Sequence, residues 1–162
     1  MASIAVLKLL VLLLLANGAP LAAKKLFGSR WSYPVDANLA FIDGRPLVGR
    51  TKTIRGLVFA IAAATAAAPL LGLDWTTGLV AGAAAMAGDL FSSFVKRRLD
   101  LDESSQAIGL DQIPESLFPL LACREAMALG VAEIVAGVAV FFVGELLISR
   151  LLYALHLRDR PY

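Results

Sequence analysis

The residues best suited to chemistry gather between Ala87 and Gln112, in the stretch AGDLFSSFVKRRLDLDESSQAIGLDQ. If the helix that enters this stretch continues, Asp89, Ser93 and Lys96 recur at i, i+4 and i+7 along one face. Asp111 ends the polar loop that follows and can bring a second carboxylate to the same place. A carboxylate that holds a divalent cation, next to cations that hold phosphates, is the combination that phosphoryl or nucleotidyl transfer requires.

The depth of Asp89 supports this interpretation. At about 1.5 Å of rise per residue, Asp89 lies roughly 9 Å below a helix end at Val95. An acid at that depth in a membrane costs about 2.5 to 3.5 kcal/mol, so it should face the protein interior or a wet cavity and be paired. A structural ion pair with a nearby Lys or Arg is the alternative. A basic cluster such as Lys96, Arg97 and Arg98 would by itself indicate only an anchor at the membrane surface. The spacing of this cluster from Asp89 is what favours a binding site.

The composition predicts a membrane protein. Of 162 residues, 59% are hydrophobic, and the mean hydropathy is +0.75, which is far above the range of soluble domains. The net charge of +2 gives no argument for nucleic acid as a partner. The single cysteine, Cys123, cannot form an internal disulfide, and the single histidine, His156, cannot build a histidine zinc site.

Five apolar segments predict an all-α, polytopic fold in one membrane domain, residues 1–162. The expected spans are 4–23, 57–73, 77–95, 113–129 and 131–152. A cleaved secretory signal competes for the first segment, because Lys8 precedes a leucine-rich core and small residues follow it. Gly78 and Gly82, at GxxxG spacing, indicate close helix packing and nothing more.

Glu115 and Glu145 lie in or near the apolar segments. Pairing among the charged residues there explains them as well as any chemistry does.

The placement of basic residues predicts the topology. Twelve of the fifteen Lys and Arg residues fall in the loops 24–56 and 96–112 or in the C-terminal tail, where Arg158 and Arg160 lie. Cytoplasmic loops are enriched in basic residues. We therefore expect the N-terminus outside, the C-terminus in the cytoplasm and both long loops on the cytoplasmic face.

The first long loop contains a basic run that resembles a phosphate-binding loop only faintly. The segment Gly49 to Gly56 lacks the GxxxxGK[ST] spacing of such a loop. Lys52 and Arg55 are still candidates for contacting a triphosphate. A solvated basic loop that faces anionic lipid headgroups is the alternative.

Several motifs, in this order along the chain, resemble the CDP-archaeol synthases, which are small integral-membrane cytidylyltransferases with relatives in bacteria. The motifs are ANGAP at 16–20, PVDANLAFIDGRPLVG at 34–49, KTIRG at 52–56, GDLFSSFVKRR at 88–98 and GLDQIPESLFPLL at 109–121. The likeness extends from about residue 16 to residue 121. The ordered set is more specific than any one motif.

The resemblance implies a five-helix membrane fold and a magnesium-dependent reaction of CTP with a lipid phosphate, of archaetidic or phosphatidic acid type. It makes Asp89 and Asp111 candidate Mg²⁺ ligands and, with Lys96, the candidate catalytic residues. The remaining candidate contacts to the nucleotide are Asp43, Lys52, Thr53, Arg55, Ser93, Arg97 and Arg98. The site would face the cytoplasm and would open sideways to membrane lipids.

Other functions fit the sequence less well. The DGxxAR motif of CDP-alcohol phosphotransferases is missing, and no Ser-His-Asp or Cys-His nucleophile is evident. The alternative from another class is a non-catalytic membrane module, either a transporter component or an assembly subunit that uses Asp89 for helix pairing. A transporter would be expected to show internal repeats, and none is convincing here. The sequence does not predict the oligomeric state.

Overall fold

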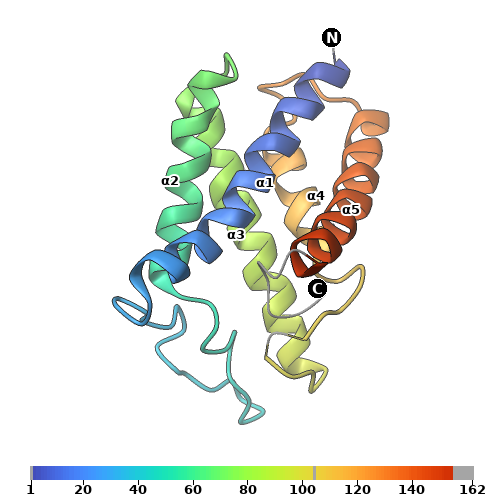
Figure 1. Ribbon diagram of the computed structural model, residues 1–162. Helices are drawn as coiled ribbons and strands as arrows, with labels where there is room; N and C mark the ends of the chain where they lie inside the picture. Colours follow the sequence, from blue (N-terminus) through green and yellow to red (C-terminus); the bar gives the residue numbers. More distant parts are fainter. Residues whose placement is uncertain (1, 104, 155–162) are drawn as a thin grey trace.

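The computed structural model describes residues 2–103 and 105–154, and this part of the chain is all-helical (Figure 1). Its five helices follow in the order α1 (Ala2–Phe27), α2 (Ile54–Leu70), α3 (Trp75–Arg98), α4 (Gln112–Ala122) and α5 (Val131–Ala154). Within the described ranges, β structure is limited to two isolated bridges in the first long loop. The predicted all-α membrane fold is confirmed.

Helix α1 contributes a large part of the core. Leu9, Leu12, Leu13 and Ala16 are fully buried, and α1 contacts each of the other four helices. In Figure 1 it crosses in front of α3. Helix α1 is therefore part of the packed bundle, and the alternative of a cleaved signal for this segment stays a prediction.

Helices α2 and α3 pack closely through small side chains. A Cβ atom on Gly78 would lie 2.4 Å from the carbonyl oxygen of Ala64, and one on Gly82 would lie 3.0 Å from the Cβ of Ala64. Such an approach is available only to glycine, and it supplies dispersion contacts where lipid offers no hydrophobic driving force. The packing role expected of these glycines is confirmed.

Within the part of the chain that the structure describes, three helices are long and apolar enough to cross a bilayer, with spans Ile4–Phe27, Trp75–Arg98 and Val131–Leu151. Helix α2 is apolar but has 17 residues. Helix α4 has 11 residues and ends at Ala122, short of the segment 113–129 expected from hydropathy. The chain leaves the helix at the C-cap residue Cys123, with a φ of −93° and a ψ of 4°, and turns follow up to Ala128, which has a φ of 49°. The number of bilayer-crossing segments stays a prediction.

The two polar loops lie together at one end of the bundle. In Figure 1 the segments 28–53 and 99–111 are at the lower end, while the N-terminus and the α2–α3 turn are at the upper end. This matches the grouping that the basic residues predict. His156, Arg158 and Arg160 lie outside the described residues.

Candidate active site

Two connected cavities lie where the polar loops meet α1, α3 and α4, with volumes of about 660 and 490 Å³. The first is lined by Lys52, Thr53, Arg55, Asp89 and Glu115, among others. The second is lined by Lys52, Ser93, Lys96, Arg97 and Asp111, among others. Both cavities share Asn17, Pro20, Lys24, Thr51, Lys52 and Glu145. The fold therefore brings most of the predicted site residues to one polar region.

Lys52 and Asp89 form an ion pair at the boundary of the two cavities. The Lys52 Nζ atom lies 2.5 Å from Asp89 Oδ1 and 2.7 Å from Oδ2. Burial alone would lower the pKa of Lys52, but the Asp89 carboxylate, with Glu115 and Asp111 farther off, raises it above the usual value. The ion pair expected of Asp89 is confirmed. The alternative of a solvated basic loop is wrong for Lys52, because this side chain is only 27% exposed.

Gly88 places Asp89 beside α4. A Cβ atom on Gly88 would lie 2.3 Å from the carbonyl oxygen of Pro114 and 2.8 Å from the Cα of Glu115. The two helices therefore touch backbone to backbone at this point. The contact brings Glu115, which is 8% exposed, into the cavity that Asp89 lines. Glu115 was not among the predicted site residues, because spacing along the chain does not reveal this crossing.

The second predicted carboxylate, Asp111, is paired with Lys96. Lys96 Nζ lies 2.7 Å from Asp111 Oδ1 and donates a hydrogen bond to the carbonyl oxygen of Ser105 at 3.1 Å. Asp111 Oδ2 accepts a hydrogen bond from the backbone N–H of Ala107. Although Asp111 stands at the N-cap position of α4, its side chain makes no capping hydrogen bond. These contacts fix the carboxylate at the wall of the second cavity.

Buried donors without partners line the same wall. Ser93 Oγ and Arg97 Nε are buried and have no hydrogen-bond partner among the described residues. Ser93 is 3% exposed and Arg97 is 8% exposed. Buried polar atoms are normally satisfied, and both residues face a cavity that also contains Lys96. An anionic ligand such as a phosphate would supply the missing acceptors.

Thr53 and Arg55 also build the loop that lines the first cavity. Thr53 caps α2, and its Oγ1 accepts a hydrogen bond from the N–H of Gly56 at 3.1 Å. The Arg55 guanidinium donates hydrogen bonds to the carbonyl oxygens of Gly28 and Arg30. Both side chains therefore already have structural partners.

Asp43 and Arg98 lie apart from the cavities. Arg98 Nη1 donates to Asp43 Oδ1 at 2.8 Å, and Nη2 donates to the carbonyl oxygen of Pro46 at 2.5 Å. The guanidinium carbon of Arg98 also lies within 5 Å of the ring centroids of Phe41 and Phe94. Neither Asp43 nor Arg98 lines either cavity. Their contacts attach the first loop to the end of α3.

Asp36 organises the first loop and was missed by the sequence reasoning. Its carboxylate accepts hydrogen bonds from the backbone N–H groups of Asn38, Val48 and Gly49 at 2.9 to 3.0 Å. Burial raises its pKa, but these hydrogen bonds outweigh burial and hold the pKa below the usual value. The signal available in the sequence was Asp-Ala-Asn, since Asp commonly bonds the backbone two residues on.

The carboxylates of the site could hold Mg²⁺ only together with oxygen atoms from a bound ligand. Asp89 and Asp111 supply hard carboxylate oxygens, which suit Mg²⁺. Among the described residues, no three His, Cys, Asp or Glu side chains converge as a metal site. Mg²⁺ commonly binds through one or two carboxylates together with substrate phosphates. The site therefore suits a metal that arrives with a nucleotide.

Comparisons with known proteins agree with the resemblance in the sequence. The family model for CarS-like CDP-archaeol synthases matches residues 2–74 and 71–162. The CDP-archaeol synthase of Sulfurisphaera tokodaii is 34% identical over 135 residues, which cover 80% of this chain and 81% of that protein. The CDP-archaeol synthase of Pyrobaculum arsenaticum is 32% identical, with 91% of each chain covered. A solved structure of an intramembrane enzyme for archaeal membrane lipid biosynthesis superposes with a TM-score of 0.73 at 30% identity, covering 87% of this chain and 90% of that one.

Proposed function

Because this chain belongs to the CDP-archaeol synthase family, we propose how its polar site carries out the family's reaction. The protein is an integral membrane enzyme that transfers a cytidylyl group from CTP to a lipid phosphate. The assignment of the site rests on the two cavities, which share part of their lining. Asp89 lines the first, and Lys96 and Asp111 line the second. The second cavity is also lined by Ser93 and Arg97, whose buried donor atoms have no partner among the described residues.

The reaction breaks one phosphoanhydride bond and forms another. A nonbridging oxygen of the lipid phosphate attacks the α-phosphorus of CTP, and the bond from that phosphorus to the oxygen bridging to the β-phosphorus breaks. The products are a CDP-lipid and pyrophosphate, so no covalent enzyme intermediate is required. The protein's task is to align the two phosphates and to stabilise the negative charge that develops on the oxygens.

The cations of the second cavity are suited to hold the triphosphate. Ser93 and Arg97 have donor atoms that lack protein partners, and Lys96 presents an ammonium to the same space. These donors are held on α3, and a rigid element can keep them aimed at the phosphate oxygens during the reaction. We assign Lys96, Ser93 and Arg97 to the triphosphate.

Mg²⁺ would be held by Asp89 and Asp111, with phosphate oxygens completing its coordination. When bound, it supplies Lewis-acid stabilisation of charge on the phosphates. Lys52 and Lys96 neutralise these carboxylates in the described structure. If Mg²⁺ occupied the carboxylates, the Lys52 and Lys96 ammonium groups would be available to bind phosphate oxygens.

The site is proposed to face the cytoplasm, where CTP is available. Both polar loops lie at the same end of the bundle (Figure 1), and the basic residues concentrate in them. The positive-inside rule favours this orientation. Asp43 and Arg98 are assigned to holding the first loop on α3, and Thr53 and Arg55 to shaping the floor of the first cavity.

A direct test supplies purified protein with CTP, Mg²⁺ and either an isoprenoid-ether or an acyl-ester lipid phosphate, and measures pyrophosphate release. Wild-type protein should release pyrophosphate, and Asp89→Asn should lose at least about 100-fold of that rate. Asp74→Asn is the control, because Asp74 is an exposed N-cap residue of α3 that lines neither cavity. Wild-type protein that is folded but inactive with both lipids would refute the proposal. An unchanged rate in Asp89→Asn would remove this residue from the site.

A further inference from the structure

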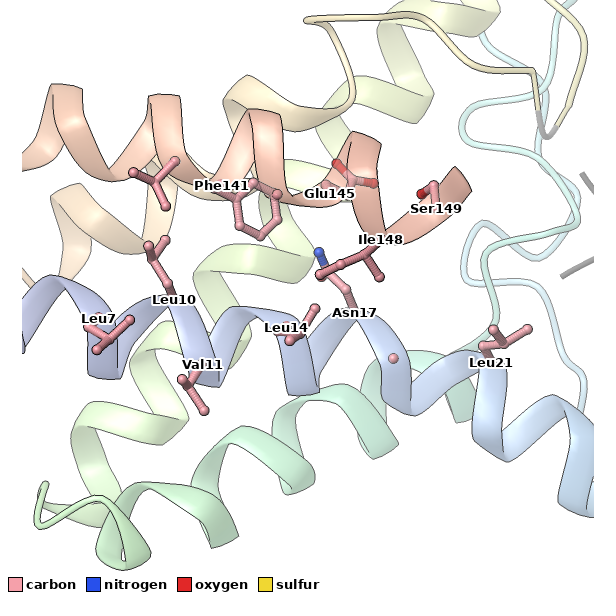
Figure 2. A pocket seen from close by; sticks show the side chains of 13 residues that line it. Leu7, Leu10, Val11, Leu14, Asn17, Leu21, Phe141, Glu145, Ile148 and Ser149 are labelled. Atoms are coloured by element: carbon pink, nitrogen blue, oxygen red, sulfur yellow. The ribbon is translucent and has the colours of Figure 1, made fainter. Parts of the chain in front are cut away.

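A third cavity, of about 360 Å³, forms an apolar groove between α1 and α5. Figure 2 shows the side chains of Leu7, Leu10 and Leu14 on α1 near Phe141 and Ile148 on α5. Leu7 and Leu14 are 62% and 46% exposed, so this surface is open to the surrounding lipid. The groove belongs to neither polar cavity, yet it meets them at one end.

The meeting point is formed by Asn17 and Glu145. These two residues line the apolar groove and both polar cavities. In Figure 2 they reach from α1 and α5 toward the space between the helices. A molecule that lies along the groove would therefore place its end beside the residues that hold phosphates.

Asn17 has an unused hydrogen-bonding atom at this point. Its Oδ1 atom is buried and has no partner among the described residues. It stands within a helix whose neighbouring core positions, Leu13 and Ala16, are fully buried and apolar. An amide oxygen without a donor is costly in such surroundings, which indicates that the junction is a polar, hydrated point at the end of an apolar groove.

We propose that the α1–α5 groove holds one hydrocarbon chain of the lipid phosphate acceptor, with the polar end of the lipid at the junction that Asn17 and Glu145 line. This inference rests on the function proposed above and adds the subsite for the second substrate. Lys24, seven residues after Asn17 on α1, lines both polar cavities. It is placed to bind the lipid phosphate while the chain stays in the groove.

The dimensions of the groove suit a lipid chain. From Leu7 to Asn17 the groove follows α1 over ten residue steps, or about 15 Å at the helical rise. One leaflet of the bilayer core is about 15 Å thick. A chain that is lifted from one leaflet could therefore lie along α1 with its phosphate directed to the polar cavities. Continuity with those cavities is what favours the substrate over a structural lipid or a second helix.

Gly144 allows the groove to be blocked selectively. It lines the apolar groove and neither polar cavity, and a Cβ atom added to it meets nothing within 4 Å. Gly144→Leu should fill the groove and raise KM for a long-chain lipid phosphate by about tenfold or more, because several methylenes lose their buried surface. The dissociation constant for CTP, measured by calorimetry, should stay within about twofold. Ala139→Leu is the control, because Ala139 is exposed on α5 and lines no cavity.

Asn17→Leu tests the junction itself. It should raise KM for the lipid phosphate by about three- to tenfold, because an apolar side chain would then face the polar end of the lipid, and change KM for CTP less. The kinetic arms use an isoprenoid-ether and an acyl-ester substrate, so that the chain chemistry preferred by the groove is measured as well. An active wild-type enzyme whose lipid KM is unchanged in both Gly144→Leu and Asn17→Leu would overturn the inference.

A labelling experiment separates this inference from the proposed function. A lipid phosphate with a photoreactive diazirine in its chain is incubated with the full-length protein in lipid nanodiscs and irradiated. Labelled peptides should come from α1 and α5, and Gly144→Leu should reduce the labelling where Ala139→Leu does not. Labelling that is confined to other helices would overturn the groove assignment. Because the experiment needs no turnover, an inactive wild-type enzyme would refute the proposed function while the labelling still decides the groove.

Discussion

The Lys52 ammonium lies 2.5 Å from the Asp89 carboxylate, although the two residues are 37 positions apart in the sequence. The contact joins the end of the first polar loop to the interior of α3. It stabilises the acid inside the bundle, where an unpaired charge would be costly. It also places a loop residue in the wall that the two cavities share.

The energetic coupling between Lys52 and Asp89 should be measurable. In a double-mutant cycle with Lys52→Met and Asp89→Asn, we expect a coupling free energy of about 1 to 3 kcal/mol, because each single variant leaves a partly buried charge without its partner. Unfolding in detergent with increasing denaturant gives the four free energies. The pair Arg45–Asp100 is the matched control, since its side chains are 39% and 80% exposed. Its coupling should stay below about 1 kcal/mol, and equal coupling in both pairs would contradict the special role of the first.

Arg97 and Arg98 are neighbours that should respond differently to substitution. Arg97 lines the second cavity and Arg98 lines neither polar cavity, so Arg97→Met should raise KM for CTP by about tenfold or more through loss of a charge-assisted hydrogen bond. Arg98 binds Asp43 and the Pro46 carbonyl. Arg98→Met should therefore release the first loop, seen as faster limited proteolysis within residues 28–53, with a smaller effect on KM for CTP. The reverse ranking of the two KM values would show that Arg98 contacts the nucleotide.

The sequence predicted those features that depend on local pattern. Apolar runs located the five helices, and helical spacing placed Asp89, Ser93 and Lys96 on one side of α3, where they now line connected cavities. Charge counting grouped the polar loops at one end. Each of these follows from residue type and period alone.

The features that the sequence did not predict depend on contacts between distant segments. Glu115 enters the site only because Gly88 lets α4 touch α3. Asn17 lines the apolar groove only because α5 packs beside α1 at this point. The length of α4 was overestimated, because hydropathy does not detect the turn that begins at Cys123. Spacing along one helix carries no information about which helix packs against it.

Gly88→Ala should destabilise the protein and disturb the site together. The added methyl group would lie 2.3 Å from the backbone oxygen of Pro114, so α4 must move away from α3. Overpacking of this kind costs about 1 to 3 kcal/mol. Gly144→Ala is the control for stability, because its methyl group meets no atom within 4 Å and alanine favours the helix by roughly 0.5 to 1 kcal/mol. Equal stability of the two variants would mean that the α3–α4 contact is looser than described.

The stability of the first loop should fall in acid because of Asp36. Hydrogen bonds from Gly49, Val48 and Asn38 hold the pKa of Asp36 below its ordinary value in the folded protein. A carboxyl group whose folded pKa is lowered contributes stability that is present above its unfolded pKa, about 3.9, and is lost as the pH falls through the folded pKa. Hydrogen exchange at the Val48 and Gly49 amides, corrected for intrinsic rates, should therefore accelerate as the pH falls from about 5 to 3. Asp36→Asn should exchange faster at neutral pH and lose most of this acid dependence. If the variant keeps the full dependence, another carboxylate in the loops is responsible.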